Sequence, residues 1–210
     1  MVDNLDSIAG KIRQDFSTKD AAREKALPMC REAIRHSGNA IRAAHRQQFG
    51  QAEEMLKAAG KLLKEAKQSI AAGSELHNTS FLRDAQKEYA EGSITLALIK
   101  GEKLPDPDEL GTDYAAYLNG LGEAVGEIRR YLLDSLRRGD RSRGEELLQV
   151  MDDIYSTLVT MDFPDAITGG LRRTTDMVRG VLERTRSDLT LTIQQKELED
   201  KLDSFKGRIQ

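Results

Sequence analysis

Acidic residues recur at three- and four-residue spacings in two segments of the chain. Glu88 and Glu91 are three residues apart, and Glu123 and Glu127 are four residues apart. In an α-helix either spacing places two carboxylates side by side, with Cβ atoms about 5–6 Å apart, so each pair repels unless a cation joins it. Four such carboxylates from two neighbouring helices would form an oxygen-rich pocket suited to Mg²⁺ or Mn²⁺. That pocket could position a water molecule and a phosphodiester for in-line attack, whereas the structural alternative is a solvated acidic face.

A second group of charged residues is basic. Arg31, Arg35, Arg42 and Arg46 follow one another at four- and seven-residue steps, with His45 beside the last, so a helix would place the arginines on one face. Guanidinium groups in a row can bind a phosphate backbone. The alternative is that they solubilise the helix or pair with acidic residues elsewhere. Aromatic residues for base stacking are scarce in this segment, so sequence-specific recognition of bases is not indicated.

Other common site chemistries have no support in the sequence. The chain contains a single cysteine, Cys30, and three histidines, none of them at the Glu-x-x-His spacing of di-iron helical bundles. Neither a glycine-rich phosphate-binding loop nor the glycine pattern around a nucleophilic serine is present. We therefore expect no zinc site and no serine or cysteine hydrolase chemistry.

The elements that must position these residues are all expected to be helices, because no β-branched run bounded by turn residues is present. Small or apolar residues recur at alternating three- and four-residue steps from Ala26 to Ile70, which predicts one long helix ending near Gly73. At 1.5 Å per residue this rod would be about 70 Å long. A rod of that length usually needs partner helices.

The remaining helices are indicated by their capping signals. Gly101 and Gly139 stand where two helices should end, and Ser142 with Glu145 has the form of a capping box. Three glycines inside one expected helix predict a close approach of another helix or of a ligand. Helices are expected from Thr79 or Ser80 to Lys100, from Thr112 or Asp113 to Arg138, over 142–158 and over 171–189, with a frayed helical tail from about 196.

Composition places the chain among ordinary folded proteins. Its 210 residues, 39% of them hydrophobic, predict a single all-α domain over residues 1–210. A net charge of −3 argues against a uniformly basic nucleic-acid coat. The absence of a long apolar run, of a signal sequence and of a second cysteine predicts a soluble protein without membrane contact, in the reducing cytoplasm.

Several short motifs, taken together in their order and spacing, resemble the translin and translin-associated factor X family, including its shorter archaeal members. His45-Arg46 in the first helix also resembles this family. The other motifs are Lys87-Glu88-Tyr89-Ala90-Glu91, Tyr117-Leu118-Asn119-Gly120, Gly126-Glu127-Ile128-Arg129-Arg130, Gly139-Asp140 and Leu171-Arg172-Arg173. The resemblance implies an all-α, long-helix bundle protomer of the translin type. Such protomers form a hollow homo-oligomer, an octamer, that binds single-stranded RNA or DNA inside.

The resemblance also assigns a function to the acidic residues. The factor X branch is a metal-dependent endoribonuclease, whereas translin itself mainly binds nucleic acid. The acidic set of the nuclease branch falls on Glu88, Glu91, Glu123 and Glu127, with Glu123 in place of the aspartate more frequent there. This implies a Mg²⁺- or Mn²⁺-dependent endoribonuclease of single-stranded RNA, with these four glutamates as metal ligands and catalytic residues. The alternatives are a non-catalytic single-stranded RNA- or DNA-binding scaffold and an all-α nucleotide pyrophosphohydrolase.

Overall fold

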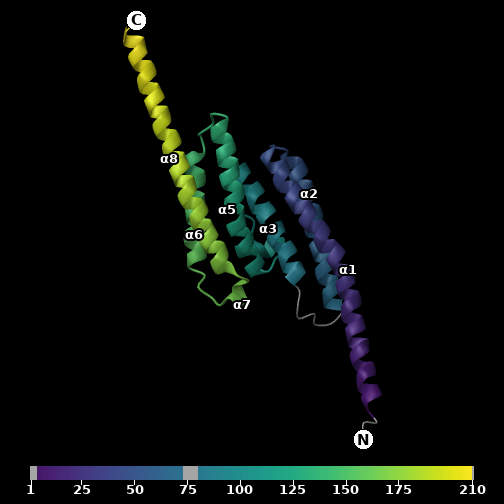
Figure 1. Cartoon of the computed structure of the whole chain (residues 1–210). Helices are drawn as coiled ribbons and strands as arrows, with labels where there is room; N and C mark the ends of the chain where they lie inside the picture. The colour runs from purple at the N-terminus through teal and green to yellow at the C-terminus, as the bar shows by residue number, and fades with distance from the viewer. Residues whose placement is uncertain (1–3, 73–79, 210) are drawn as a thin grey trace. The chain divides into compact units, whose positions relative to one another are not determined.

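The structure, a computed structural model, describes residues 4–72 and 80–209. Within these ranges the chain forms helices and turns and no strand, which confirms the all-α prediction. The helices, all but α4 labelled in Figure 1, are α1 (Leu5–His45), α2 (Phe49–Ala72), α3 (Ser80–Lys100), α4 (Pro107–Leu110), α5 (Tyr114–Arg137), α6 (Gly144–Val159), α7 (Asp165–Thr168) and α8 (Leu171–Ile209).

The chain divides into two compact units, residues 1–120 and 121–210. In the first unit α1, α2 and α3 each contact the other two. In the second unit α6 packs along α8, and the short α7 contacts α8. The boundary falls after Gly120, inside α5, so this helix begins in the first unit and ends in the second. The expectation of one domain over residues 1–210 stays a prediction.

The predicted single rod from Ala26 to Ile70 is wrong, because the chain turns back between α1 and α2. Gln47 has a φ of 60°, and its N–H donates to the carbonyl of Ala44 over 2.9 Å. The two helices then lie side by side (Figure 1). The three- and four-residue pattern continues through the turn because each helix buries its small-residue stripe against the other. No glycine or proline lies between the two helices, so the sequence does not mark where the first one ends.

Small side chains form the core between these helices. Ala26, Cys30 and Ala33 of α1 pack with Ala59 and Ala66 of α2, and all five are buried. Small residues at these positions allow the two helix backbones to approach closely. Burial also raises the pKa of the Cys30 thiol to about 11, so the thiol is neutral at physiological pH and is a poor nucleophile.

The start of α1 differs from the prediction as well. The helix begins at Leu5, well before Ala26, and continues through Pro28 without ending. Proline removes one helical hydrogen bond and is costly inside a helix. Here the packed stripe on both sides of Pro28 keeps the helix continuous.

Several predicted helix ends are confirmed. α3 ends at Lys100, and Gly101 follows with a φ of 72°. α5 begins after Asp113, whose Oδ1 accepts the N–H of Ala115 over 3.0 Å, and Gly139 follows its end with a φ of 82°. The predicted end of the rod at Gly73 and the start of the next helix at Thr79 lie outside the described residues.

The predicted capping box at Ser142 and Glu145 is wrong, although α6 itself lies where expected. Asp140 Oδ1 accepts both the N–H of Ser142, over 3.0 Å, and its hydroxyl, over 2.7 Å. These two hydrogen bonds lower the pKa of Asp140. α6 therefore starts at Gly144 without a side-chain cap. A capping box is found instead at α4, from Asp106 and Glu109.

Among the described residues, no helix combines the length and the apolar character that are needed to cross a bilayer.

Candidate metal centre

α3 is held against α2 by two close contacts within the first unit. A Cβ on Gly60 of α2 would lie 2.8 Å from the Tyr89 hydroxyl oxygen, and a Cβ on Gly92 would lie 3.1 Å from Leu56 Cδ2. A Cβ at Gly60 would require the Tyr89 side chain to shift, and a Cβ at Gly92 would press on Leu56, so both glycines allow α3 to lie close to α2. Burial between the helices raises the pKa of Tyr89. The turns of α3 that carry Glu88 and Glu91 are therefore fixed in position by packing.

The start of α5 is fixed against the same turns of α3. A Cβ on Gly120 would lie 2.7 Å from the carbonyl oxygen of Lys87 and 2.9 Å from the backbone nitrogen of Glu91. The two helices thus touch backbone to backbone at this point. The predicted close approach of a helix to the glycine-containing segment is confirmed at Gly120. Asp113, just before α5, lies 3.9 Å from Arg83 of α3, so the first turns of both helices lie together.

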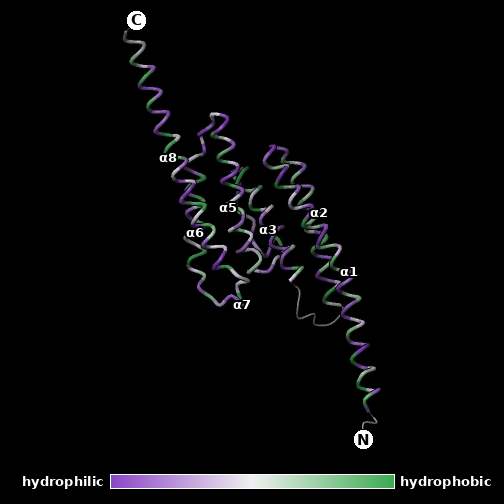
Figure 2. Tube along the Cα trace, in the orientation of Figure 1, coloured by the Kyte–Doolittle hydropathy of each residue, from purple (hydrophilic) through white to green (hydrophobic). Residues whose placement is uncertain are grey.

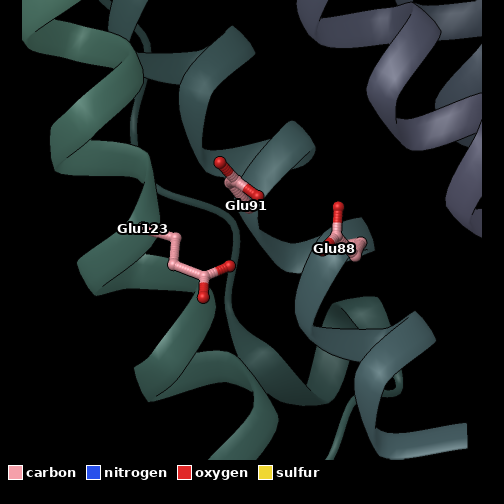
Figure 3. Close-up of side chains that lie close together, drawn as sticks. All are labelled: Glu88, Glu91 and Glu123. Atoms are coloured by element: carbon pink, nitrogen blue, oxygen red, sulfur yellow. The ribbon is translucent and has the colours of Figure 1, made fainter. Parts of the chain in front are cut away.

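Three of the four predicted glutamates meet at this crossing. One carboxylate oxygen from each of Glu88, Glu91 and Glu123 lies within 4.8 Å of the others. Figure 3 shows Glu88 and Glu91 on α3 and Glu123 on α5. Glu123 follows Gly120 by three residues, so the glycine contact places it about one helical turn beyond the crossing. All three side chains are partly buried.

Glu127 does not belong to this group. It lies one turn after Glu123 on α5 and is partly buried. Its Oε2 atom lies 3.6 Å from Nη1 of Arg130. The structure therefore distinguishes two kinds of position among the four predicted residues, three with converging oxygens and one a turn away.

The donor set fits a small divalent cation. Mg²⁺ takes oxygen ligands at about 2.1 Å in an octahedron, so two of its ligand atoms lie about 3–4 Å apart. The oxygens of Glu88, Glu91 and Glu123 lie within 4.8 Å of one another, which is close to this spacing. Carboxylates suit Mg²⁺ and Mn²⁺, whereas Zn²⁺ prefers thiolate or imidazole.

The predicted basic residues lie along one side of α1, with Arg46 directly after its last residue. Arg31, Arg35, Arg42 and Arg46 are exposed, and His45 is partly buried. Arg35 contacts Glu32 over 2.6 Å, and Arg42 donates to the side chain of Asn39. Since both contacts are local and exposed, they leave the guanidinium groups accessible to an anion.

One polar residue on the carboxylate-bearing helix was not predicted from the chemical motifs. Thr95 is completely buried and follows Glu91 by four residues on α3. It is the polar residue in the otherwise apolar run from Ile94 to Ile99. An isolated hydroxyl in helical register with two acidic residues is the sequence signal from which Thr95 could have been identified.

Comparison with known proteins identifies relatives over most of the chain. No protein-family model matches it. An uncharacterized protein of Methanocaldococcus jannaschii is 28% identical over 191 residues, which cover 89% of this chain and 83% of that protein. The solved structure of NeC3PO without ligand is 21% identical to this chain, with a TM-score of 0.73. The match covers 91% of this chain and 98% of NeC3PO. At this identity the similarity establishes a shared fold and nothing more.

AfC3PO is more similar. Its structures in complex with duplex RNA and alone are both 34% identical to this chain, with TM-scores of 0.81 and 0.80. In both comparisons the match covers 89% of this chain and 97% of AfC3PO. AfC3PO and NeC3PO are translin-family proteins. At this identity and coverage, the chain described here belongs to the translin and translin-associated factor X family.

Proposed function

We propose that this chain is a nucleic-acid-binding protein and a Mg²⁺-dependent endoribonuclease that acts on single-stranded RNA. The observation that carries the proposal is the convergence of carboxylate oxygens from Glu88, Glu91 and Glu123 within 4.8 Å. The similarity to AfC3PO, which has been solved in complex with duplex RNA, supports binding of nucleic acid. A carboxylate group of this kind is the expected holder of a cation beside a phosphodiester.

Each glutamate has a role in this proposal. Glu88, Glu91 and Glu123 would hold Mg²⁺ or Mn²⁺, which would supply Lewis-acid stabilisation of the negative charge on the phosphodiester. Glu127, one turn along α5, takes a proton from the attacking water at a carboxylate oxygen. We assign the proton transfer to Glu127 because it lies outside the converging group and is not a ligand of the ion in this proposal.

The basic side of α1 serves to bind the substrate. Arg31, Arg35, Arg42 and Arg46, with His45 beside them, contact the phosphate backbone and not the bases. Binding of this kind is independent of sequence and weakens steeply as salt is added, because each neutralised phosphate releases counterions.

The protein works as a homo-oligomer in this proposal, an octamer that encloses its substrate. Large apolar side chains are exposed near the free ends of two long helices, Leu5, Ile8, Ile12 and Phe16 on α1 and Leu191, Leu198, Leu202 and Phe205 on α8. Figure 2 shows hydrophobic and hydrophilic positions alternating along both helices. Exposed apolar stripes of this kind indicate surfaces that bind protein.

The test is an RNA cleavage assay with the purified full chain. End-labelled single-stranded RNA, and a duplex of the same sequence, are incubated with Mg²⁺ or with EDTA. We expect cleavage of the single strand with Mg²⁺ only, and a loss of about 100-fold or more in the Glu123→Ala protein. Glu54→Ala, which changes an exposed glutamate of α2, serves as the matched control and should cleave like the wild type.

Each other result has a definite meaning. RNA that is bound but intact in every lane would identify a non-catalytic scaffold. Cleavage that persists unchanged in the Glu123→Ala and Glu127→Ala proteins would show that the site is elsewhere. Release of pyrophosphate from free nucleoside triphosphates would identify a nucleotide pyrophosphohydrolase.

A further inference from the structure

Thr95 is a buried polar residue whose hydroxyl is unsatisfied. The residue is 0% exposed, and Oγ1 has no hydrogen-bond partner among the residues that the structure describes. Hydroxyls inside these helices usually donate to the carbonyl four residues earlier, as Ser93 does to Tyr89 over 2.8 Å and Ser37 to Ala33 over 2.9 Å. Thr95 lacks this bond. A buried hydroxyl without a partner costs free energy, so its presence requires an explanation.

The position of Thr95 on α3 supplies one. At 100° per residue, Thr95 points about 20° away from the direction of Glu88 and about 40° away from that of Glu91, which places it between the two. Helical side chains lean toward the N-terminus of their helix, so the Thr95 side chain lies over the turn that carries Glu91. Side chains four residues apart on one helix face are in reach of each other.

A carboxylate that binds a metal ion needs hydrogen-bond donors as well. Its second oxygen is usually held by an outer partner, which fixes the orientation of the ligand. We propose that the Thr95 hydroxyl donates to the Glu91 carboxylate oxygen that faces away from the cation, once a cation has drawn Glu91 inward. Thr95 is therefore a positioning residue, which contacts neither the ion nor the RNA. The inference rests on the proposed metal centre of Glu88, Glu91 and Glu123.

The experiment compares two substitutions of similar size. Thr95→Val removes the hydroxyl and keeps the shape, whereas Thr95→Ser keeps the hydroxyl. Mn²⁺ binding to the full chain is measured by titration calorimetry, and thermal unfolding is measured in EDTA. We expect Thr95→Val to bind Mn²⁺ about 10- to 100-fold more weakly than the wild type, and Thr95→Ser to bind as the wild type does.

Unfolding in EDTA separates this role from a purely structural one. Thr95→Val should unfold at the wild-type temperature or higher, because the unsatisfied hydroxyl is gone. Ser93→Ala is the matched control on the same helix. Its hydroxyl has a backbone partner, so its loss should lower the unfolding temperature and leave the affinity for Mn²⁺ unchanged.

Two results would overturn the inference while leaving the metal centre in place. One is wild-type Mn²⁺ affinity in Thr95→Val, and the other is an equal loss in Thr95→Val and Thr95→Ser, which would assign the effect to packing. If the wild-type chain binds no Mn²⁺, the proposed metal centre itself fails, and the inference with it. If Thr95→Val does not fold, Thr95→Ala is compared with Thr95→Ser in the same way.

Discussion

Glu123 and Glu127 lie on successive turns of α5, yet the structure gives them different surroundings. Glu123 shares the 4.8 Å group with two glutamates of α3, whereas Glu127 contacts Arg130 of its own helix. Replacement by glutamine keeps the size and removes the charge, so it separates ion binding from proton transfer. We expect Glu123→Gln to lose both Mn²⁺ binding and RNA cleavage. Glu127→Gln should retain Mn²⁺ binding and cleave about 100- to 10,000-fold more slowly.

Calorimetry and single-turnover cleavage at saturating Mn²⁺ check this pair of variants. If Glu127→Gln weakened Mn²⁺ binding as strongly as Glu123→Gln, Glu127 would be a ligand. If Glu127→Gln cleaved RNA at the wild-type rate, another group would have to accept the proton.

The sequence predicts which faces of the two helices carry the carboxylates of the candidate centre, but not which of these carboxylates converge. The spacing of Glu88 and Glu91 fixes one face of one helix, and the spacing of Glu123 and Glu127 fixes another. Which carboxylates converge depends on how the two helices cross, and that is decided by the Gly120 contact in the folded protein. Thr95 shows the same limit, because a threonine in an apolar run has no visible role until its burial is known.

The crossing of α3 and α5 can be tested through two glycines of the same helix. Gly120→Ala places a methyl group 2.7 Å from a carbonyl oxygen of α3, so the helices must separate and Glu123 must move away from Glu91. Such overpacking costs about 1–3 kcal/mol of stability. We expect a lower unfolding temperature and weaker Mn²⁺ binding for Gly120→Ala.

Gly126→Ala is the matched control for that variant. A Cβ at Gly126 meets nothing within 4 Å, and alanine is favoured over glycine inside a helix by about 0.5–1 kcal/mol. Thermal unfolding should therefore show Gly126→Ala to be slightly more stable than the wild type, with unchanged Mn²⁺ affinity. Equal behaviour of the two variants would contradict the close contact at Gly120.

Helix ends could be predicted where a residue enforces them. Gly101 and Gly139 both take positive φ values after a helix, which is a conformation that glycine adopts without strain. The turn between α1 and α2 could not be predicted in this way, because Gln47 adopts its positive φ without being a glycine. Apolar periodicity identified the residues that are buried. The turn that packs α2 back onto α1 depends on tertiary contacts, which periodicity does not reveal.

The exposed ends of α1 and α8 are the features that a single copy of the chain leaves unexplained. Ile12 and Phe16 are 47% and 64% exposed, and Leu198 and Leu202 are 59% and 51% exposed. In each helix these residues fall on one stripe, because they are separated by four residues. Aspartate on such a stripe adds charge to a surface that association would bury, at a high cost in free energy.

The oligomer proposed here therefore depends on these stripes, and single substitutions test it. We expect Ile12→Asp and Leu198→Asp to lower the mass measured by light scattering at micromolar concentration, relative to the oligomeric wild type. The helix content measured by circular dichroism should remain unchanged, since both side chains are exposed in the protomer. Gln14→Asp is the matched control, because Gln14 is exposed on the opposite side of α1 and should leave the mass unchanged. A monomeric wild type would contradict self-association itself, whereas an unchanged mass in both stripe variants would move the subunit contacts to other faces.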